Sequence, residues 1–326
     1  TFNALISAAC KGGLPSYAFD AFEVMKTTDV AASRRTYNEL IHAAGLRGIA
    51  GVEAAFEVYD SMRLAGEVPD QVTFGSLIAA CARARDASRA LLVFEEMREV
   101  GCAPSLVVYH ALLVGLGRAG RFEEAVALYR NEMLEHEDPE CRPTKATLSI
   151  MFDVCLGRDG AEAALAAAAG ASSFGSAVYF HSKGAMAAKQ LYTEAVESGM
   201  MPRICPELDA LDANDDETQG MRSLRADIRC HTRSAAIMAL LGLLDALKTK
   251  DADLHELVVM TGGRVRTNGP SRPSKLLLTA QALLTAQGVR SKPLSTLTVQ
   301  ALVVDKPALT KWKSSVDVPQ TLGVEA

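Results

Sequence analysis

The first half of the chain repeats itself about every 35 residues, and this limits its fold more than any other feature of the sequence. A six-residue phrase occurs at 1–6 (TFNALI), 36–41 (TYNELI) and 73–78 (TFGSLI), with weaker copies at 108–113 (VYHALL) and 147–152 (TLSIMF). We call the third residue of each phrase its marker residue: Asn3, Asn38, Gly75, His110 and Ser149. The spacings between marker residues are 35, 37, 35 and 39. Such a period indicates stacked supersecondary units.

Each of the first four units also contains a second phrase, in which Ala, an aromatic residue and Met follow one another. The four copies are Ala18, Phe22 and Met25; Ala55, Tyr59 and Met62; Ala90, Phe94 and Met97; and Ala125, Tyr129 and Met133. Residues three and four positions apart lie on one face of a helix, so this phrase predicts the buried stripe of a second helix. Turn residues such as Gly12, Gly13 and Gly120 separate the two phrases. Each unit is therefore predicted to be a helical hairpin.

A single hairpin cannot cover its own apolar face, so neighbouring hairpins must stack. We expect a mainly α protein: a right-handed or gently curved α-solenoid with a long concave groove over residues 1–157, in four to five units of which the first is truncated. Because Thr1 falls inside the repeat pattern, we also expect the natural chain to begin further upstream. Residues 158–220 are expected to form a degenerate capping repeat and an acidic linker.

The pattern changes in the last third of the chain. Strands are predicted at 224–230 and 257–260, a helix with a continuous apolar face at 234–250, a second helix at 273–287 and a further apolar run at 297–304. Alternation of strands and helices favours a small α/β sandwich. We therefore expect a separate C-terminal domain over residues 221–326.

The charge distribution supports this division. The net charge is −5, but residues 221–326 carry 15 Lys/Arg against 8 Asp/Glu, whereas residues 1–150 carry 15 against 20 and residues 151–220 carry 4 against 11. A basic unit that follows an acidic one is a candidate for contact with a polyanion.

Cysteine and histidine usage gives no sign of a metal or disulfide framework. The seven cysteines are scattered singly, which favours reduced thiols, and the six histidines have no metal-ligand spacing. No stretch reaches the roughly 18 unbroken apolar residues of a membrane span. We therefore expect no cofactor, with a divalent metal only if the protein is a nuclease, and no membrane partner.

The repeat pattern resembles the pentatricopeptide repeat family, with T-[FY]-N-x-L-I, then A-x3-[FY]-x2-M, then G-x2-P, over residues 1 to about 157. In that family each unit reads one base of single-stranded RNA through the marker residue and the residue that closes the unit. The resemblance implies four pairs: Asn3 with Ser33, Asn38 with Asp70, Gly75 with Ser105, and His110 with Thr144; Ser149 begins a fifth. The first two pairs resemble the family's pyrimidine-preferring combinations, and the last two do not match its code. The alternative is that the Asn residues satisfy local groups near a helix start.

A Gly/Arg loop follows the predicted strand at 257–260. Backbone amides and arginine side chains between a strand and a helix can hold phosphate, although this loop is neither a Walker motif nor a dinucleotide fingerprint. A mobile surface loop is an equally good interpretation of these residues alone. The candidate phosphate-binding residues are Arg229, Thr261, Gly262, Gly263, Arg264 and Arg266.

Residues 222–304 resemble the small MutS-related (Smr) domain, through Ala226-Asp227-Ile228-Arg229-Cys230 and Thr261-Gly262-Gly263-Arg264. Asp227, the candidate catalytic residue, matches that family's motif, but Arg229 stands where its histidine is expected and Arg264 where its second glycine is expected. Arg cannot act as a general base at neutral pH, so we expect anion binding without cleavage. His231 is expected to be structural, and Asp227 could instead end the strand or pair with Arg229.

These patterns lead to three functional hypotheses. The first is an RNA-binding protein of the plant or algal organellar type, in a chloroplast more than in a mitochondrion, that acts in RNA processing, stability or expression. The second is an Smr-type endonuclease acting on RNA or DNA. The third is a protein-interaction scaffold in plastid gene expression or plastid-to-nucleus signalling. The location and these roles are implied by the resemblance alone.

Overall fold

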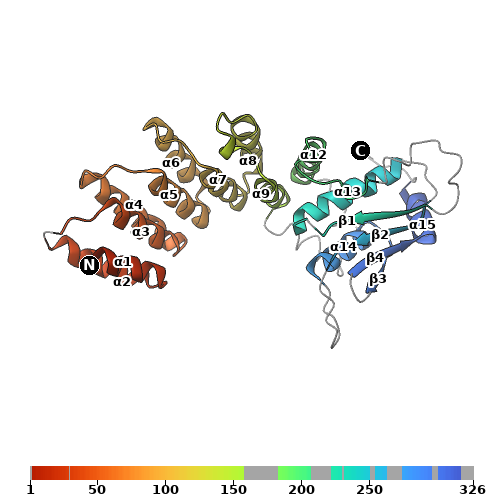
Figure 1. The fold of residues 1–326 in the computed structure, drawn as a ribbon, viewed down its shortest axis with the longest axis horizontal. Coiled ribbons are helices and arrows are strands. Elements are labelled where there is room, and N and C mark those ends of the chain that lie inside the picture. Colours follow the sequence, from red (N-terminus) through yellow and green to blue (C-terminus); the bar gives the residue numbers. More distant parts are fainter. Residues whose placement is uncertain are drawn as a thin grey trace, which may run out of the picture. The chain divides into compact units, whose positions relative to one another are not determined.

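The computed structural model describes residues 2–28, 30–157, 183–206, 222–229, 231–249, 254–262, 274–295 and 300–316. The chain divides into two compact units, Thr1–Gly157 and Arg158–Ala326 (Figure 1). Within these ranges no helix is long and apolar enough to cross a membrane.

The first unit is a series of helical hairpins (Figure 1). Its first helices, which carry the marker residues, are α1 (Phe2–Lys11), α3 (Arg34–Gly45), α5 (Gln71–Ala84), α7 (Leu106–Arg118) and α9 (Lys145–Leu156). Its second helices are α2 (Pro15–Lys26), α4 (Ile49–Leu64), α6 (Ala87–Glu99) and α8 (Phe122–Leu128), which continues into the π-helical turn η1 (Tyr129–Met133); a short 3-10 turn, η2 (Pro139–Cys141), precedes α9. The first helices α1, α3, α5 and α7 each pack against their own second helix and against the next first helix. The predicted stack of hairpins is confirmed.

The predicted buried stripe of the second helices is also confirmed, because every Ala, aromatic residue and Met of the second phrase is at most 4% exposed. Its aromatic residues meet the aromatic residue that precedes the next marker residue. Ring centroids are 5.6 Å apart for Phe22 and Tyr37 and 5.7 Å apart for Phe94 and Tyr109, in edge-on geometry. The aromatic residues of the repeat thus hold consecutive units together.

The fourth unit contains one extra residue between its aromatic residue and its Met. Tyr129 and Met133 are four positions apart, whereas Phe94 and Met97 are three apart. The π-helical turn η1 spans Tyr129–Met133 and takes up that residue, so both side chains stay buried.

Small residues allow the first helices to approach one another closely. For the markers Asn38, Gly75 and His110, the residue seven positions after the marker packs against the residue five positions after the next marker, and at least one of the two is Gly. The pairs are Gly45 with Ala80, Ala82 with Gly115, and Gly117 with Val154. An ideal Cβ at Gly45 would lie 2.8 Å from the Ala80 Cβ, and one at Gly117 would lie 2.6 Å from the Val154 Cγ2. Larger side chains would force neighbouring units apart.

The turn between the two helices of a hairpin needs a left-handed residue. Gly13, Gly48 and Gly120 have φ values of 71°, 66° and 76° ten positions after their markers. The equivalent residue in the third unit is Arg85, with φ 62°, which among non-glycine residues is an unfavourable conformation.

The C-terminal compact unit, Arg158–Ala326, contains α12 (Lys183–Glu197) and a four-stranded mixed sheet with its own helices. These elements are β1 (Arg222–Asp227), α13 (Arg233–Thr249), β2 (Leu254–Met260), α14 (Lys275–Ala286), β3 (Lys292–Ser295), β4 (Gln300–Asp305) and α15 (Lys306–Val316). The strand order is β1-β2-β4-β3: β1 and β2 are parallel, and β4 is antiparallel to β2 and β3. α12 and α14 both pack on α13, and α15 packs on β2 and β4.

Three elements of this unit differ from the sequence prediction. β1 ends at Asp227, not at residue 230, because the Asp227 carboxylate accepts the Arg229 backbone N–H at 3.0 Å and turns the chain. β3 was not predicted, since its Pro293 is unusual in a strand; as the last strand of the sheet, β3 tolerates it. α15 was not predicted either, although Pro307 in its first turn is a typical helix-start signal.

The expected degenerate repeat lies partly outside the described residues, as does the acidic linker. Its second half is α12, in which Ala188 and Tyr192 are buried at the spacing of the second phrase.

Candidate nucleic-acid interface

The marker residues and the residues that close each unit come together where consecutive first helices meet. Asn3, Asn38, Gly75 and His110 lie in the early turns of α1, α3, α5 and α7, whereas Ser33, Asp70, Ser105 and Thr144 are the N-cap residues of the next first helices. The closing residue of each proposed pair therefore lies at the start of the next first helix.

The second pair forms a closed ring of hydrogen bonds with Thr73, the third residue of α5. The Asn38 Nδ2 donates to the Asp70 Oδ1 at 3.1 Å, and the Thr73 hydroxyl donates to the Asn38 Oδ1 at 2.7 Å. The Asp70 backbone N–H in turn donates to the Thr73 hydroxyl at 3.1 Å, completing the capping box of α5. Burial alone would raise the pKa of Asp70, but hydrogen bonds from Thr73 and Asn38 and the charge of Arg34 lower it below its ordinary value.

The first pair shares the link through a threonine but not the whole ring. The Thr36 hydroxyl, on the third residue of α3, donates to the Asn3 Oδ1 at 2.7 Å and lies 2.9 Å from the Ser33 hydroxyl. Asn3 and Asn38 therefore bond a side chain of the next unit. The alternative in which these residues satisfy only local backbone groups is not what the structure shows.

The fourth pair has the same partners with a different marker residue. The His110 Nε2 lies 2.8 Å from the Thr147 hydroxyl, which also accepts the Thr144 backbone N–H at 3.0 Å. Burial lowers the pKa of His110, which favours its neutral form. We refer to Thr36, Thr73 and Thr147 as the clamp threonines.

The third pair lacks this connection. Gly75 has no side chain, Val108 stands in place of a clamp threonine, and within the described residues the Ser105 side chain makes no cap hydrogen bond. An ideal Cβ at Gly75 would lie 3.5 Å from the Val108 Cγ2, which is an ordinary contact.

Ser149, the last marker residue, donates its hydroxyl to the Lys145 carbonyl of its own helix at 3.1 Å. The residues that would close its unit lie outside the described part of the chain.

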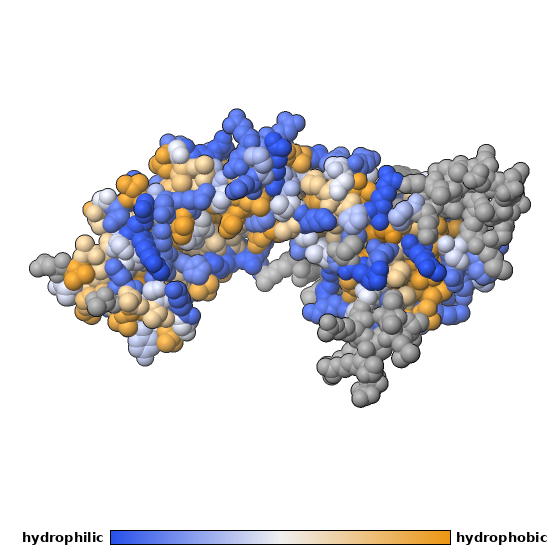
Figure 2. Space-filling model, in the orientation of Figure 1, coloured by the Kyte–Doolittle hydropathy of each residue, from blue (hydrophilic) through white to orange (hydrophobic). Residues whose placement is uncertain are grey.

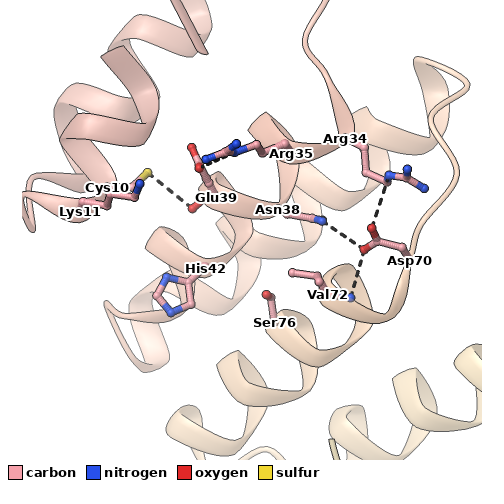
Figure 3. Close-up of a pocket in the computed structure, with 10 residues that line it drawn as sticks. All are labelled: Cys10, Lys11, Arg34, Arg35, Asn38, Glu39, His42, Asp70, Val72 and Ser76. Atoms are coloured by element: carbon pink, nitrogen blue, oxygen red, sulfur yellow. Dashed lines mark hydrogen bonds and ion pairs between the residues drawn. The ribbon is translucent and has the colours of Figure 1, made fainter. Parts of the chain in front are cut away.

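Two cavities open on the first helices, one at each of the first two pairs. A cavity of about 530 Å³ contains Asn38 and Asp70 (Figure 3); its lining residues are Cys10, Lys11, Arg34, Arg35, Asn38, Glu39, His42, Asp70, Val72 and Ser76. A second cavity of about 520 Å³ contains Asn3 and Ser33 and shares Lys11, Arg35 and Glu39 with the first. The paired side chains thus stand in hollows beside basic groups.

Two apolar residues of this surface were missed by the sequence analysis. Val72 and Val107 are 59% and 73% exposed, and each precedes a marker residue by three positions, which places it on the same helix face. Figure 2 shows hydrophilic and hydrophobic residues interspersed over the face of this unit in view. The sequence signal for them was an apolar residue three positions before the marker residue, although the second repeat has Arg35 at that position.

In the C-terminal compact unit, Arg158–Ala326, the structure brings together the two segments proposed to hold phosphate. An ideal Cβ at Gly262, which has φ 67°, would lie 3.0 Å from the Arg229 Cγ, so this glycine lies against the Arg229 side chain. The Arg229 Nε donates to both Asp227 carboxylate oxygens at 2.9 and 3.1 Å, and these hydrogen bonds lower the pKa of Asp227. Asp227 therefore both ends its strand and pairs with Arg229.

The remaining residues of the proposed phosphate site divide into two groups. Thr261 is 2% exposed and its hydroxyl donates to the Gln300 carbonyl at 2.9 Å, so its side chain joins the strands. Gly263, Arg264 and Arg266 lie outside the described residues. His231 is buried and lies against Tyr192, with ring centroids 6.2 Å apart. The described residues contain no group of three or more His, Cys, Asp or Glu that could hold a metal ion.

Comparison with known proteins finds similarity in the repeats. The family model described as the pentacotripeptide-repeat region of PRORP matches residues 6–165. A pentatricopeptide repeat-containing protein of Arabidopsis thaliana is 39% identical over 79 residues, which are 24% of this chain and 8% of that protein.

Two solved structures are similar at low sequence identity. The pentatricopeptide repeat protein PPR10 from maize, in complex with an 18-nt psaJ RNA element, has a TM-score of 0.46 at 22% identity, covering 76% of this chain and 32% of that one. The PPR domain of Arabidopsis thaliana protein-only RNase P 1, in complex with tRNA, has a TM-score of 0.42 at 18% identity, covering 61% of this chain and 98% of that one. The chain thus spans about a third of PPR10 and less than a tenth of the curated relative.

Proposed function

We propose that this array binds single-stranded RNA along its first helices, with the marker and closing residues facing the bases; the match of residues 6–165 to the pentacotripeptide-repeat model supports this. The observation that carries the proposal is that two successive pairs, Asn3 with Ser33 and Asn38 with Asp70, each lie in a cavity of their own. Amide, hydroxyl and carboxylate groups in such hollows can meet the hydrogen-bonding edge of a base. Exposed Val72 offers apolar surface to a base face at the same place.

Basic side chains beside these cavities can meet the RNA backbone. Lys11 and Arg35 line both cavities, and the Arg35 side chain is 78% exposed even though it pairs with Glu39 at 3.2 Å. An exposed ion pair of this kind contributes little to stability, so a phosphate can replace the carboxylate as its partner at small cost. The acidic balance of the array as a whole does not prevent this local contact.

The test is fluorescence anisotropy with pooled single-stranded RNA over a salt series. Arg35→Ala should weaken binding and reduce the slope of log affinity against log salt by roughly 0.7, the value for one phosphate contact in single-stranded nucleic acid. Arg98→Ala is a matched control, because Arg98 lies on a second helix and also pairs with a Glu, at 3.3 Å from Glu132. An equal effect of both substitutions would mean that binding is generic attraction and not contact along the first helices.

The C-terminal unit is proposed to be Smr-like and to hold nucleic-acid backbone, of RNA or of DNA. The contact between Gly262 and the Arg229 side chain supports this, since it joins the two segments that resemble the Smr motifs. An Arg264→Ala/Arg266→Ala double variant should show a shallower salt dependence than the parent. An unchanged salt dependence would exclude these two residues from the interface.

Cleavage has no observation of its own in favour. The Asp227 carboxylate already accepts hydrogen bonds from Arg229, which leaves it poorly placed to activate water or hold a metal. A divalent-metal cleavage assay with Asp227→Ala as control would overturn this view if the parent cut RNA and the variant did not.

The proposed setting is an organelle, a chloroplast before a mitochondrion, with a role in RNA processing, stability or expression. This follows from the family resemblance, and imaging of the tagged full-length protein tests it. If the protein failed to bind RNA at low salt and retained a stable protein partner, the scaffold function would replace RNA binding.

A further inference from the structure

The clamp threonines occupy the same place in three units. Thr36, Thr73 and Thr147 are the third residues of α3, α5 and α9, and each is at most 1% exposed. Each hydroxyl lies within 2.8 Å of the marker residue of the preceding unit. The hydrogen bonds to the clamp threonine thus restrict the side-chain orientation of the marker residue.

We infer that the clamp threonines are positioning residues that decide which donor and acceptor atoms the marker residues present to RNA, and that the unit without one does not discriminate between bases. The inference rests on the proposed RNA-binding function. It adds buried residues that do not themselves face a base to the set that determines specificity.

At Asn38 the surroundings leave only one amide orientation. A carboxylate can only accept hydrogen bonds, so the Asn38 NH2 group must face Asp70. Thr73 accepts the Asp70 backbone N–H, and its own proton goes to the nearer of two acceptors, the Asn38 Oδ1 at 2.7 Å and not the Asp70 Oδ1 at 3.0 Å. A flipped amide would set its oxygen against the carboxylate and lose the bond from its NH2 group to Asp70. Asn38 therefore keeps one N–H and one lone pair in a fixed order.

The same arrangement selects a tautomer of His110. Thr36 and Thr73 both donate to their marker residues, and a donating Thr147 requires an unprotonated Nε2. The proton of the neutral ring then resides on Nδ1, which has no hydrogen-bond partner among the described residues. The fourth unit would present a single donor to a base acceptor.

The third unit shows what happens without the clamp. Val108 cannot donate a hydrogen bond and Gly75 has no side chain to orient. The base opposite this unit therefore meets no fixed hydrogen-bonding group from the marker position. The 3.5 Å separation between an ideal Gly75 Cβ and Val108 leaves space for a marker side chain.

The first experiment needs no RNA. Nitrogen-15 NMR of the full chain, with the six histidines assigned by substitution, should show the His110 ring as the Nδ1–H tautomer. Thr147→Val should give a tautomer mixture, and Thr147→Ser, which keeps the hydroxyl, should restore the original spectrum. An Nε2–H ring in the parent, or a spectrum unmoved by Thr147→Val, would overturn the inference for this unit.

The second experiment measures base preference with fully randomised single-stranded RNA and sequencing of the bound fraction. Thr73→Val should reduce the preference at one RNA position by about fivefold, the value of one ordinary hydrogen bond, while the other positions keep theirs. Thr73→Ser should keep the preference, because it retains the hydroxyl that bonds to Asn38. A uniform loss at every position, or a loss that Ser does not repair, would show a merely structural role.

A gain of preference provides the converse test. Gly75→Asn/Val108→Thr should create a new preference at the RNA position that the parent leaves open, and Gly75→Asn alone should create a weaker one. Equal preferences in both variants would contradict a positioning role. If the parent binds no RNA, the proposed function fails, whereas the tautomer of His110 still decides the role of Thr147. A parent that binds RNA but selects no sequence would contradict the inference alone.

Discussion

The close packing of first helices can be tested with one methyl group. In Gly45→Ala the new Cβ would lie 2.8 Å from the Ala80 Cβ and 3.2 Å from the Ala80 Cα. Carbon atoms in favourable contact are about 3.5–4.0 Å apart, and neither of these neighbours can move by changing a rotamer. The overlap can be relieved only if α3 moves away from α5.

Two opposing contributions set the size of the effect. Ala is preferred over Gly inside a helix by about 1 kcal/mol, and overpacking costs about 1–3 kcal/mol. We expect Gly45→Ala to lower the free energy of unfolding by about 1 kcal/mol. Gly242→Ala in α13 is the matched control: its Cβ would have no atom within 4 Å, so it should raise stability by up to about 1 kcal/mol. The same chemical change should have opposite signs in the two helices.

Urea titration can follow both units in the intact chain. Trp312 is the only tryptophan and lies in α15, so its fluorescence reports on the second unit, whereas far-ultraviolet circular dichroism reports mainly on the repeats. Gly45→Ala should shift only the dichroism transition. In the double variant Gly45→Ala/Ala80→Gly, the loss in free energy of unfolding should be smaller than the sum of the two single losses by about 1 kcal/mol. Stabilisation by Gly45→Ala, or no coupling in the double variant, would refute the close-packing argument.

Two further substitutions test the turns and caps of the repeats. Arg85→Gly should stabilise the first unit by about 1 kcal/mol in the same titration, because Arg85 holds a left-handed conformation that Gly adopts freely; a loss of stability would mean that the Arg85 side chain contributes more than its backbone costs. Asp70→Ala should cost about 1 kcal/mol at neutral pH by removing the cap of α5. Since the pKa of Asp70 is lowered on folding, this contribution is present above the ordinary Asp pKa and disappears as pH falls through the folded value. A difference between parent and Asp70→Ala that persisted in acid would show that the carboxylate charge is not what stabilises the helix.

The repeat architecture was predictable because each repeat contains two sequence phrases, one for each helix of its hairpin. A marker phrase and a second phrase at a fixed period leave few ways to bury both stripes, and the hairpins of unit 1 follow that pattern. The π-helical turn of the fourth unit was not predicted, because one added residue between Tyr129 and Met133 could equally have displaced Met133 from the core. Only the packing of the neighbouring helices decides between these outcomes.

The C-terminal compact unit was less predictable because its sequence signals for strands and helices conflict. Pro293 argues against a strand, yet β3 is at the edge of the sheet, where a missing N–H is tolerated. The apolar face of α13 was sufficient to predict that helix, since its buried Leu residues recur at helical spacing.

The candidate site shows a similar division. The pairs of marker and closing residues follow from the resemblance to the repeat family, but their shared partner does not, because a Thr at the third position of a helix is expected from capping alone. The sequence signal for this shared partner was the Thr that opens every marker phrase except the fourth, which opens with Val108. Only the hydrogen bond from that Thr to the preceding unit shows that it has a second partner.

This double use connects the stability of the array to its proposed selectivity. The Thr73 hydroxyl caps α5 and also holds Asn38, so an RNA base that bonds to Asn38 would add a partner to a ring that already fixes the helix start. Bound RNA should then protect the first amides of α5 from hydrogen exchange more than those of α7. The start of α7 has no such ring, since Val108 and Gly75 interrupt it and Ser105 makes no side-chain cap hydrogen bond within the described residues. Equal protection of the two helix starts would mean that RNA binding and capping are independent.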